Sequence, residues 1–167
     1  RPKLFVDTSP EEGIATIESR LMPRLHALHA SVRYMREQGY GKVILLTTDA
    51  ARIPTPAESM IGAAGAVVMS LTRSLAQELA GFGSRVNAIA TTLTTGTPGQ
   101  DTFLKAQAAG SQEVIVRAFN KVAERVKFRM NSAEDLAEYI LFLASPESDQ
   151  ISGSTISING GLSFLGY

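Results

Sequence analysis

Two histidines are the first side chains in this sequence that could carry chemistry, since imidazole serves both as a metal ligand and as an acid or base. His26 and His29 lie three residues apart in a segment with helical periodicity. No acidic residue lies near them to complete a metal site. The chain contains no cysteine, which excludes a disulfide, a thiolate metal site and a cysteine nucleophile. We therefore predict no metal site and expect both histidines to have surface or packing roles.

Hydroxyl and cationic groups are the other candidates. Thr94, Thr95 and Thr97 lie in a threonine-rich segment that could bind a phosphate, although such a segment is more often a turn. Arg20 could bind an anion, and Tyr40 lies where a helix is expected to meet a strand. For these two residues we expect ordinary roles, as a surface arginine and a packed tyrosine.

Composition limits the classes of partner. The chain is 44% hydrophobic and 19% charged, and its 16 basic residues balance its 16 acidic residues. No net field attracts nucleic acid or an anionic membrane. No run approaches the ~18 continuous apolar residues that span a bilayer, and the first residues lack the apolar core of a secretion signal. We expect a cytoplasmic protein with no nucleic-acid partner and no membrane segment.

The elements that would position these groups alternate regularly. A helix is predicted from Ser9-Pro10 to about Glu37, because a hydroxyl cap, proline and early carboxylates precede an apolar stripe. The stripe comprises Ile14, Ile17, Leu21, Leu25, Leu28, Val32 and Met35. Further helices are predicted at Ser59–Leu79, at Asp101–Val126 with a break near Gly110-Ser111, and at Ser132–Ala144 behind a capping box with Asp135. Short apolar strands are predicted at Lys42–Thr48, Arg85–Ala90 and Ser154–Ile158. This order indicates right-handed crossovers and one α/β domain with a parallel sheet over residues 1–167.

Three segments resemble the short-chain dehydrogenase/reductase family. Residues 7–42 are similar to its long helix, residues 39–90 to its central stretch and residues 132–161 to its final helix and strand. The clearest motifs are Arg85-Val86-Asn87-Ala88-Ile89, Ile151-Ser152-Gly153 and Asn159-Gly160-Gly161, which stand where the family has "RVNAI", "ITG" and Asp-Gly-Gly. The resemblance implies the C-terminal half of a Rossmann-like, doubly wound parallel sheet. The cofactor-binding N-terminal half of the family fold is absent from this chain.

The family transfers hydride between a nicotinamide cofactor and an alcohol or ketone. The resemblance implies a tyrosine as general acid and base, a lysine that lowers its pKa, a serine and an asparagine. Here the asparagine position is Arg20, the serine position is Thr48, the tyrosine position is Ile61 and the lysine position is Gly65. Thr48 could still donate a hydrogen bond, but isoleucine carries no ionisable proton. The resemblance therefore implies that the catalytic positions are degenerate.

The family's cofactor contacts are also missing. Thr91-Thr92 replaces the Pro-Gly that follows "RVNAI", and the glycine-rich phosphate loop would lie upstream of Arg1. We expect no cofactor in this chain and NAD in a catalytic partner. The strand at Lys42–Thr48 would in addition lack a neighbour on one side, which requires either an upstream segment or a second chain. We favour an upstream segment.

Assembly is the function that remains. Family members associate through the long helix and the following helix, and the partner-interface candidates here are Leu25, Leu28, Val32, Ala63, Val67 and Ser74. The sequence predicts a non-catalytic subunit of an NAD-dependent alcohol or hydroxyacyl-CoA dehydrogenase, joined to a homologous catalytic subunit in a heterotetramer. The alternatives are an enzyme of divergent chemistry and a small-molecule-binding module that reuses the degenerate pocket.

Overall fold

The computed structural model describes residues 2–110 and 114–164 of the chain. Its longest element is helix α1, Pro10–Gln38, which follows a single 3-10 turn, η1, at Phe5–Asp7. Ser9 and Glu12 form a reciprocal capping box, in which each side chain accepts the other's backbone N–H at 3.2 and 3.0 Å. Gly39 ends the helix in the left-handed region, at φ 68°. The predicted helix and both its ends are therefore confirmed.

Three parallel strands form the sheet in the order β1-β2-β3. They are β1 (Gly41–Thr48), β2 (Ser84–Thr91) and β3 (Thr155–Ile158). In register, Thr48 lies opposite Thr91, and Thr91 lies opposite Ile158. The carboxyl ends of all three strands therefore meet at one edge of the sheet, which is where open parallel sheets bind their ligands.

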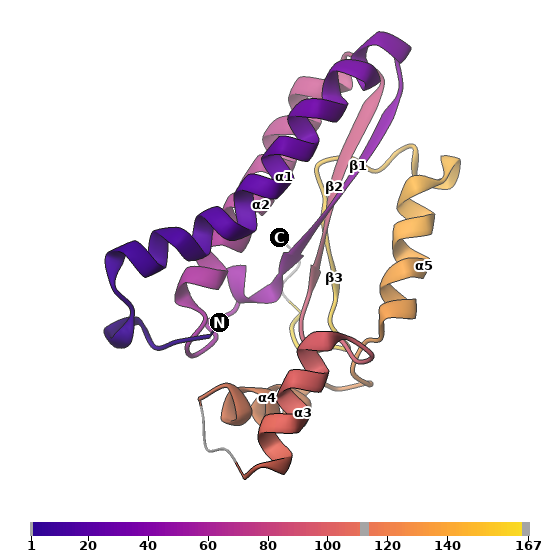
Figure 1. Ribbon diagram of the computed structural model, residues 1–167. Helices are drawn as coiled ribbons and strands as arrows, with labels where there is room; N and C mark the ends of the chain where they lie inside the picture. The colour runs from indigo at the N-terminus through magenta and orange to yellow at the C-terminus, as the bar shows by residue number, and fades with distance from the viewer. Residues whose placement is uncertain (1, 111–113, 165–167) are drawn as a thin grey trace.

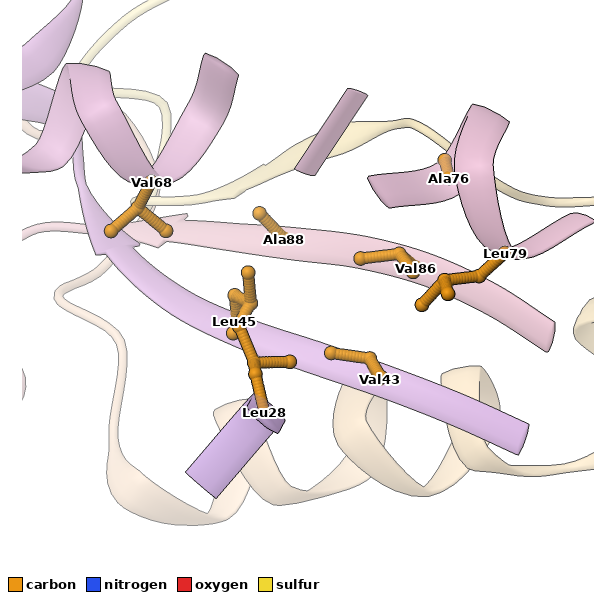
Figure 2. Packing of buried hydrophobic residues seen from close by; sticks show 8 residues of the cluster. All are labelled: Leu28, Val43, Leu45, Val68, Ala76, Leu79, Val86 and Ala88. Atoms are coloured by element: carbon orange, nitrogen blue, oxygen red, sulfur yellow. The ribbon is translucent and has the colours of Figure 1, made fainter. Parts of the chain in front are cut away.

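Helices cover both faces of this sheet, as a doubly wound fold requires (Figure 1). Helices α1 and α2 (Ser59–Ala80) lie side by side on one face, and α5 (Ala133–Ala144) covers the other. The larger core lies beneath α1 and α2, where Val68 and Leu79 meet Val43, Leu45 and other strand residues (Figure 2). The second core joins Ile89, Leu143 and Ile158 under α5.

The region between β2 and α5 forms two helices beyond the carboxyl edge of the sheet, α3 (Pro98–Ala108) and α4 (Val114–Arg125) (Figure 1). The rings of Phe103 and Phe119 stack with centroids 3.4 Å apart and hold these helices together. The expected break near Gly110-Ser111 is seen at Gly110, where φ is 69°. Ser111 lies outside the described residues.

The open side of β1 is the main departure from a closed core. Among the described strands β1 pairs only with β2, so its outer edge is unpaired. Leu46 points to the face that α5 covers only in part, and it remains 41% exposed. Ile14, which we predicted on the apolar stripe of α1, is 55% exposed and does not belong to the core beneath α1 and α2. Among the described strands, β1 therefore carries the free edge that the family resemblance led us to expect.

Among the described residues, α2 is long and apolar enough to cross a membrane by length and composition alone. Its apolar residues have another explanation in this structure. Val68, Ala76 and Leu79 are buried against the sheet, and α2 also packs along α1. Its composition is that of a helix buried against a sheet.

Candidate functional site

Thr48 ends β1 at the carboxyl edge and occupies the serine position that the family resemblance implies. Its Oγ1 accepts the backbone N–H of Ala50 at 3.2 Å, which caps the short 3-10 turn η2 at Asp49–Ala51. Its methyl group points toward α2, where a Cβ at Gly65 would lie only 2.7 Å from Thr48 Cγ2. The threonine thus serves the local backbone and the contact between strand and helix.

The positions of the family's tyrosine and lysine lie one turn apart on α2. Ile61 is 7% exposed, and its aliphatic side chain offers no proton. Gly65 is buried, and Thr47 Oγ1 donates to its carbonyl oxygen at 3.1 Å. A Cβ at position 65 would also approach Ala51 Cβ to 3.1 Å. Strand and turn therefore occupy the space that a side chain would need, and glycine at position 65 offers no amino group that could bind a ribose.

Arg20 lies on the exposed side of α1, at the asparagine position. Its positive charge lies near the carboxyl group of Glu58, the residue that precedes α2, and favours the ionised form of that group. Burial raises the pKa of Glu58, and the charge of Arg20 acts in the opposite direction. Sequence reasoning missed Glu58. The only signal was its place three residues before Ile61.

A buried polar cluster ties the ends of β1 and β3 together, and this was also missed. Asp49 Oδ1 pairs with Arg52 Nη2 at 2.9 Å, and both side chains are almost fully buried, at 3% and 7% exposure. Asn159 Nδ2 donates to Asp49 Oδ2 at 2.5 Å and to Ser163 Oγ at 2.9 Å. Arg52 Nη2 also donates to Ser157 Oγ. The cluster fills the carboxyl edge of the sheet with charges that are satisfied inside the protein.

The threonine-rich loop is held in a similar way. Asn131 Nδ2 donates to Thr91 Oγ1 at 3.0 Å and to Thr94 Oγ1 at 2.8 Å. Thr95 Oγ1 donates to the carbonyl of Asn131 at 3.3 Å. Thr97 caps α3 by accepting the N–H of Gln100 at 3.4 Å. These contacts support the simpler interpretation, in which the threonines shape a turn.

Thr92 completes the pair that replaces the family's Pro-Gly. Its carbonyl oxygen accepts from Thr91 Oγ1 at 3.4 Å and from Thr94 Oγ1 at 3.2 Å. Together with Gly65, these residues do not supply the lysine or the Pro-Gly backbone that would hold a nicotinamide ribose in the family. The described residues therefore do not fit the family's cofactor contacts.

A cavity of about 560 Å³ lies beside the lost tyrosine position. Its walls come from the N-terminal segment, from α1 and from the start of α2, and they include Ile61 and Met60. Thr16 and Ser19 line it from α1, and each hydroxyl donates its proton to a helix carbonyl, at 2.9 and 3.0 Å. Lys3 and Glu12 also line the cavity and form an ion pair at 2.7 Å, so the cavity presents apolar groups, hydroxyl oxygens and one pair of opposite charges.

The remaining sequence candidates are dispersed. His26 and His29 are exposed on α1. Tyr40, just before β1, is 46% exposed, so the expectation of a packed tyrosine was wrong. Among the described residues no three histidines or carboxylates gather in a group that could hold a metal ion.

The six interface candidates divide into two groups. Ala63, Val67 and Ser74 are exposed along one side of α2. Leu25 is half-buried, and Val32 packs against the larger core. Leu28 is 8% exposed and belongs to that core, so it supports the sheet and is not an accessible surface residue.

Comparison with known proteins agrees with the fold. The protein-family model described as enoyl-(acyl carrier protein) reductase matches residues 1–163. The chain therefore belongs to the short-chain dehydrogenase/reductase family.

Particular relatives show how much of that fold is present. The short-chain reductase protein NovJ of Streptomyces niveus is 30% identical over 96% of this chain and 60% of its own length. The 3-oxoacyl-[acyl-carrier-protein] reductase FabG of Thermotoga maritima is 30% identical over 97% of this chain and 61% of its own length. The chain thus spans about three fifths of the curated relatives that it matches.

One solved structure is similar over nearly the whole of this chain. It is an NADPH-bound short-chain oxidoreductase from Pseudomonas aeruginosa PAO1, described as containing an atypical catalytic center. It is 29% identical, with a TM-score of 0.84, and the match covers 99% of this chain and 62% of that one. The similarity extends over α1, the sheet and α5 alike.

Proposed function

We propose that this chain forms part of a non-catalytic subunit that joins a homologous, catalytically competent short-chain dehydrogenase/reductase. The observation that carries the proposal is the packing at Gly65. The lysine position lies against Thr48, Thr47 and Ala51, so a longer side chain there requires the Thr48 side chain or the helix to move. The tyrosine position is a buried isoleucine. General acid and base groups supply about 10²–10⁴-fold of rate in enzymes, and here both the acid and its activating cation are gone.

The open face of α2 supports the second half of the proposal. Ala63, Val67 and Ser74 are exposed at helical spacing, and Val67 is a 41% exposed aliphatic side chain. Small residues along such a face let a neighbouring helix approach closely. Met22 and Tyr34 on α1 add further exposed apolar surface. A homologous subunit would present matching helices to this surface.

The partner's reaction follows from its class. It would oxidise or reduce a hydroxyacyl or oxoacyl thioester with NAD, in a hetero-oligomer such as a heterotetramer. The relatives named as acyl-carrier-protein reductases support this substrate class. We propose that the assembly is of the kind formed by hydroxy(phenyl)methylsuccinyl-CoA dehydrogenase, in which one subunit is degenerate, and that this chain takes the part of such a subunit.

Native mass spectrometry of the protein purified from its source cells, with and without NADH, tests the proposal. We expect this chain to appear with a longer homologous subunit and NADH to add once per copy of that partner. A homo-oligomer of this chain that takes up NADH by itself would overturn the proposal.

A second candidate function is divergent chemistry or ligand binding in the same region, and two observations favour it. The Pseudomonas aeruginosa relative is described with NADPH and with an atypical catalytic center. The cavity beside Ile61 is also of a size typical for small-molecule sites. A thermal-shift screen with acyl-CoA thioesters separates the two candidates, because only a bound ligand stabilises the fold.

A further inference from the structure

The segment before α1, residues 2–8, forms one wall of the cavity beside Ile61. Pro2, Lys3 and Thr8 line this cavity of about 560 Å³, and the other walls belong to α1 and to the start of α2. We call residues 2–8 the strap. Because the strap is a wall of the cavity, its position decides how widely the cavity opens.

The strap is folded on itself. The hydroxyl of Thr8 donates to the carbonyl oxygen of Leu4 at 2.8 Å, and the N–H of Asp7 donates to the same oxygen at 3.0 Å. The N–H of Thr8 donates to the carbonyl oxygen of Phe5 at 3.1 Å. None of the residues of η1 is buried, and Phe5 and Val6 are 69% and 85% exposed. Burial of apolar side chains therefore contributes little to holding the strap in place.

Lys3 makes the hydrogen bonds and the ion pair that join the strap to the rest of the described chain. Its backbone N–H donates to the carbonyl oxygen of Ala57, just before α2, at 2.8 Å. Its ammonium group pairs with the carboxylate of Glu12 on α1 at 2.7 Å, and the two side chains are 46% and 55% exposed. Both partners line the cavity. Exposed ion pairs contribute little to stability and are screened by salt, so the strap is held weakly.

The backbone of Ala57 is an independent sign that this attachment has a role. Among the described residues, Ala57 is the non-glycine residue with a positive φ, at 66°, and it is 8% exposed. Alanine is strained in this conformation, and such strain gathers at ligand clamps and switch regions. The strained residue lies where the strap is attached to the loop before α2.

We propose that the strap is a movable cover of the cavity beside Ile61, and that the ion pair between Lys3 and Glu12 is its latch. The hydrogen bonds inside the strap do not involve the latch, so the strap can move as a unit once the ion pair breaks. A small molecule would then enter or leave the cavity without unfolding of α1 or α2. This movement is independent of association with a partner subunit.

Thiol labelling of the purified protein measures access to the cavity, because the chain has no cysteine of its own. Ile61→Cys places a single thiol in the cavity wall. Met60→Cys, in the same wall, is a second reporter should Ile61→Cys fold poorly. Leu141→Cys, at a 70% exposed position on α5, is the reporter for open solvent. The reagent is iodoacetamide, which is uncharged, and the rate of alkylation is followed by mass spectrometry.

The latch variants are made in each reporter background. Glu12→Gln removes the charge but keeps an oxygen that can accept the N–H of Ser9 in the capping box. Lys3→Gln removes the charge on the other side. We expect each variant to raise the alkylation rate at the cavity thiol several-fold, and the double variant to raise it no further. Glu11→Gln, which removes a neighbouring charge outside the ion pair, is the matched control and should leave the rate unchanged.

The reporter in open solvent completes the test. Alkylation at Leu141→Cys should be the same with and without the latch variants, because no part of the strap lines that position. The proposal is overturned if Glu12→Gln and Lys3→Gln both leave the cavity thiols at their original rate. It is equally overturned if Glu11→Gln accelerates them as much, or if the latch variants accelerate Leu141→Cys to the same degree.

Discussion

At the scale of single residues, the close packing around Gly65 is the main difference from a site in which only the catalytic side chains had changed. A Cβ there would come within 2.7 Å of Thr48 Cγ2, a separation that real Cβ atoms do not show. The helix backbone therefore packs closely against the strand, and a lysine side chain at position 65 would need a neighbouring group to move.

Gly65→Ala should for that reason destabilise the protein, although alanine is the better helix former. Overpacking costs about 1–3 kcal/mol, which outweighs the gain of up to about 1 kcal/mol in helix propensity. Adding Thr48→Ser removes the colliding methyl and should restore part of the loss. Urea denaturation of the two single variants and the double variant measures the coupling. If the losses simply add in the double variant, the contact is not the cause.

Asp49→Asn tests the buried cluster at the carboxyl edge. The change removes the carboxylate charge that faces Arg52 in a nearly dry environment, and disruption of such pairs costs about 3–5 kcal/mol. Glu12→Gln, in the exposed pair with Lys3, is the matched control and should change stability far less. Equal losses of unfolding free energy in the two variants would contradict the structural role of Asp49.

The sequence allowed only part of this site to be predicted. Thr48, Ile61 and Gly65 could be placed because they follow the spacing of a recognisable motif. Asp49 and Asn159 are 110 residues apart, and their hydrogen bond depends on strand order that local periodicity does not encode. The Cβ contact at Gly65 likewise depends on how closely helix and strand approach, which no sequence pattern specifies.

At the scale of elements, prediction was more successful because capping chemistry is local. The capping boxes at Ser9 and Ser132 mark the starts of α1 and α5, and Gly39 marks the end of α1. The region from Asp101 to Val126 resolved into two helices, since Gly110 adopts a positive φ. Their relative placement depends on the stacked rings of Phe103 and Phe119, which periodicity could not indicate.

Asp135 should make the start of α5 sensitive to acid. Hydrogen bonds from Arg129 and from the backbone of Ser132 hold the pKa of this carboxyl well below its ordinary value of 3.8. The unfolded chain therefore binds the proton more readily, so the carboxylate stabilises the fold above about pH 4 and loses this effect as the pH falls. Asp135→Asn should be less stable than the unmodified protein at neutral pH, and the difference should shrink toward pH 2. Glu138→Gln, on the same helix but outside the capping box, is the control. A difference that stays constant with pH would contradict this assignment.

Val67→Glu tests the open face of α2. A charge placed there should disrupt association with a homologous subunit, because burying it costs desolvation free energy, yet should leave the fold intact. Lys121→Glu, exposed on α4, is the control that should assemble normally. Analytical ultracentrifugation of the purified complex measures the change. An unchanged sedimentation coefficient for Val67→Glu would exclude this face from the interface.

At the scale of the whole molecule, the parallel sheet and the coverage of both its faces follow from the alternation of helices and strands in the sequence, whereas the order β1-β2-β3 is seen only in the structure. Among the described residues, the unpaired edge of β1 and the exposed Leu46 are the parts of the sheet that the chain leaves uncovered. Relatives are longer, and this chain matches about three fifths of their length.

The most direct test of the account is turnover of acetoacetyl-CoA by the purified protein, free of any homologous subunit. Loss of NADH and of NADPH absorbance is followed against increasing protein concentration, with Thermotoga maritima FabG as the active control. The account predicts a rate equal to that of buffer alone, because positions 61 and 65 supply neither an acid nor a cation. A saturable rate proportional to the concentration of this protein would contradict it and would show that other residues of this chain perform the chemistry.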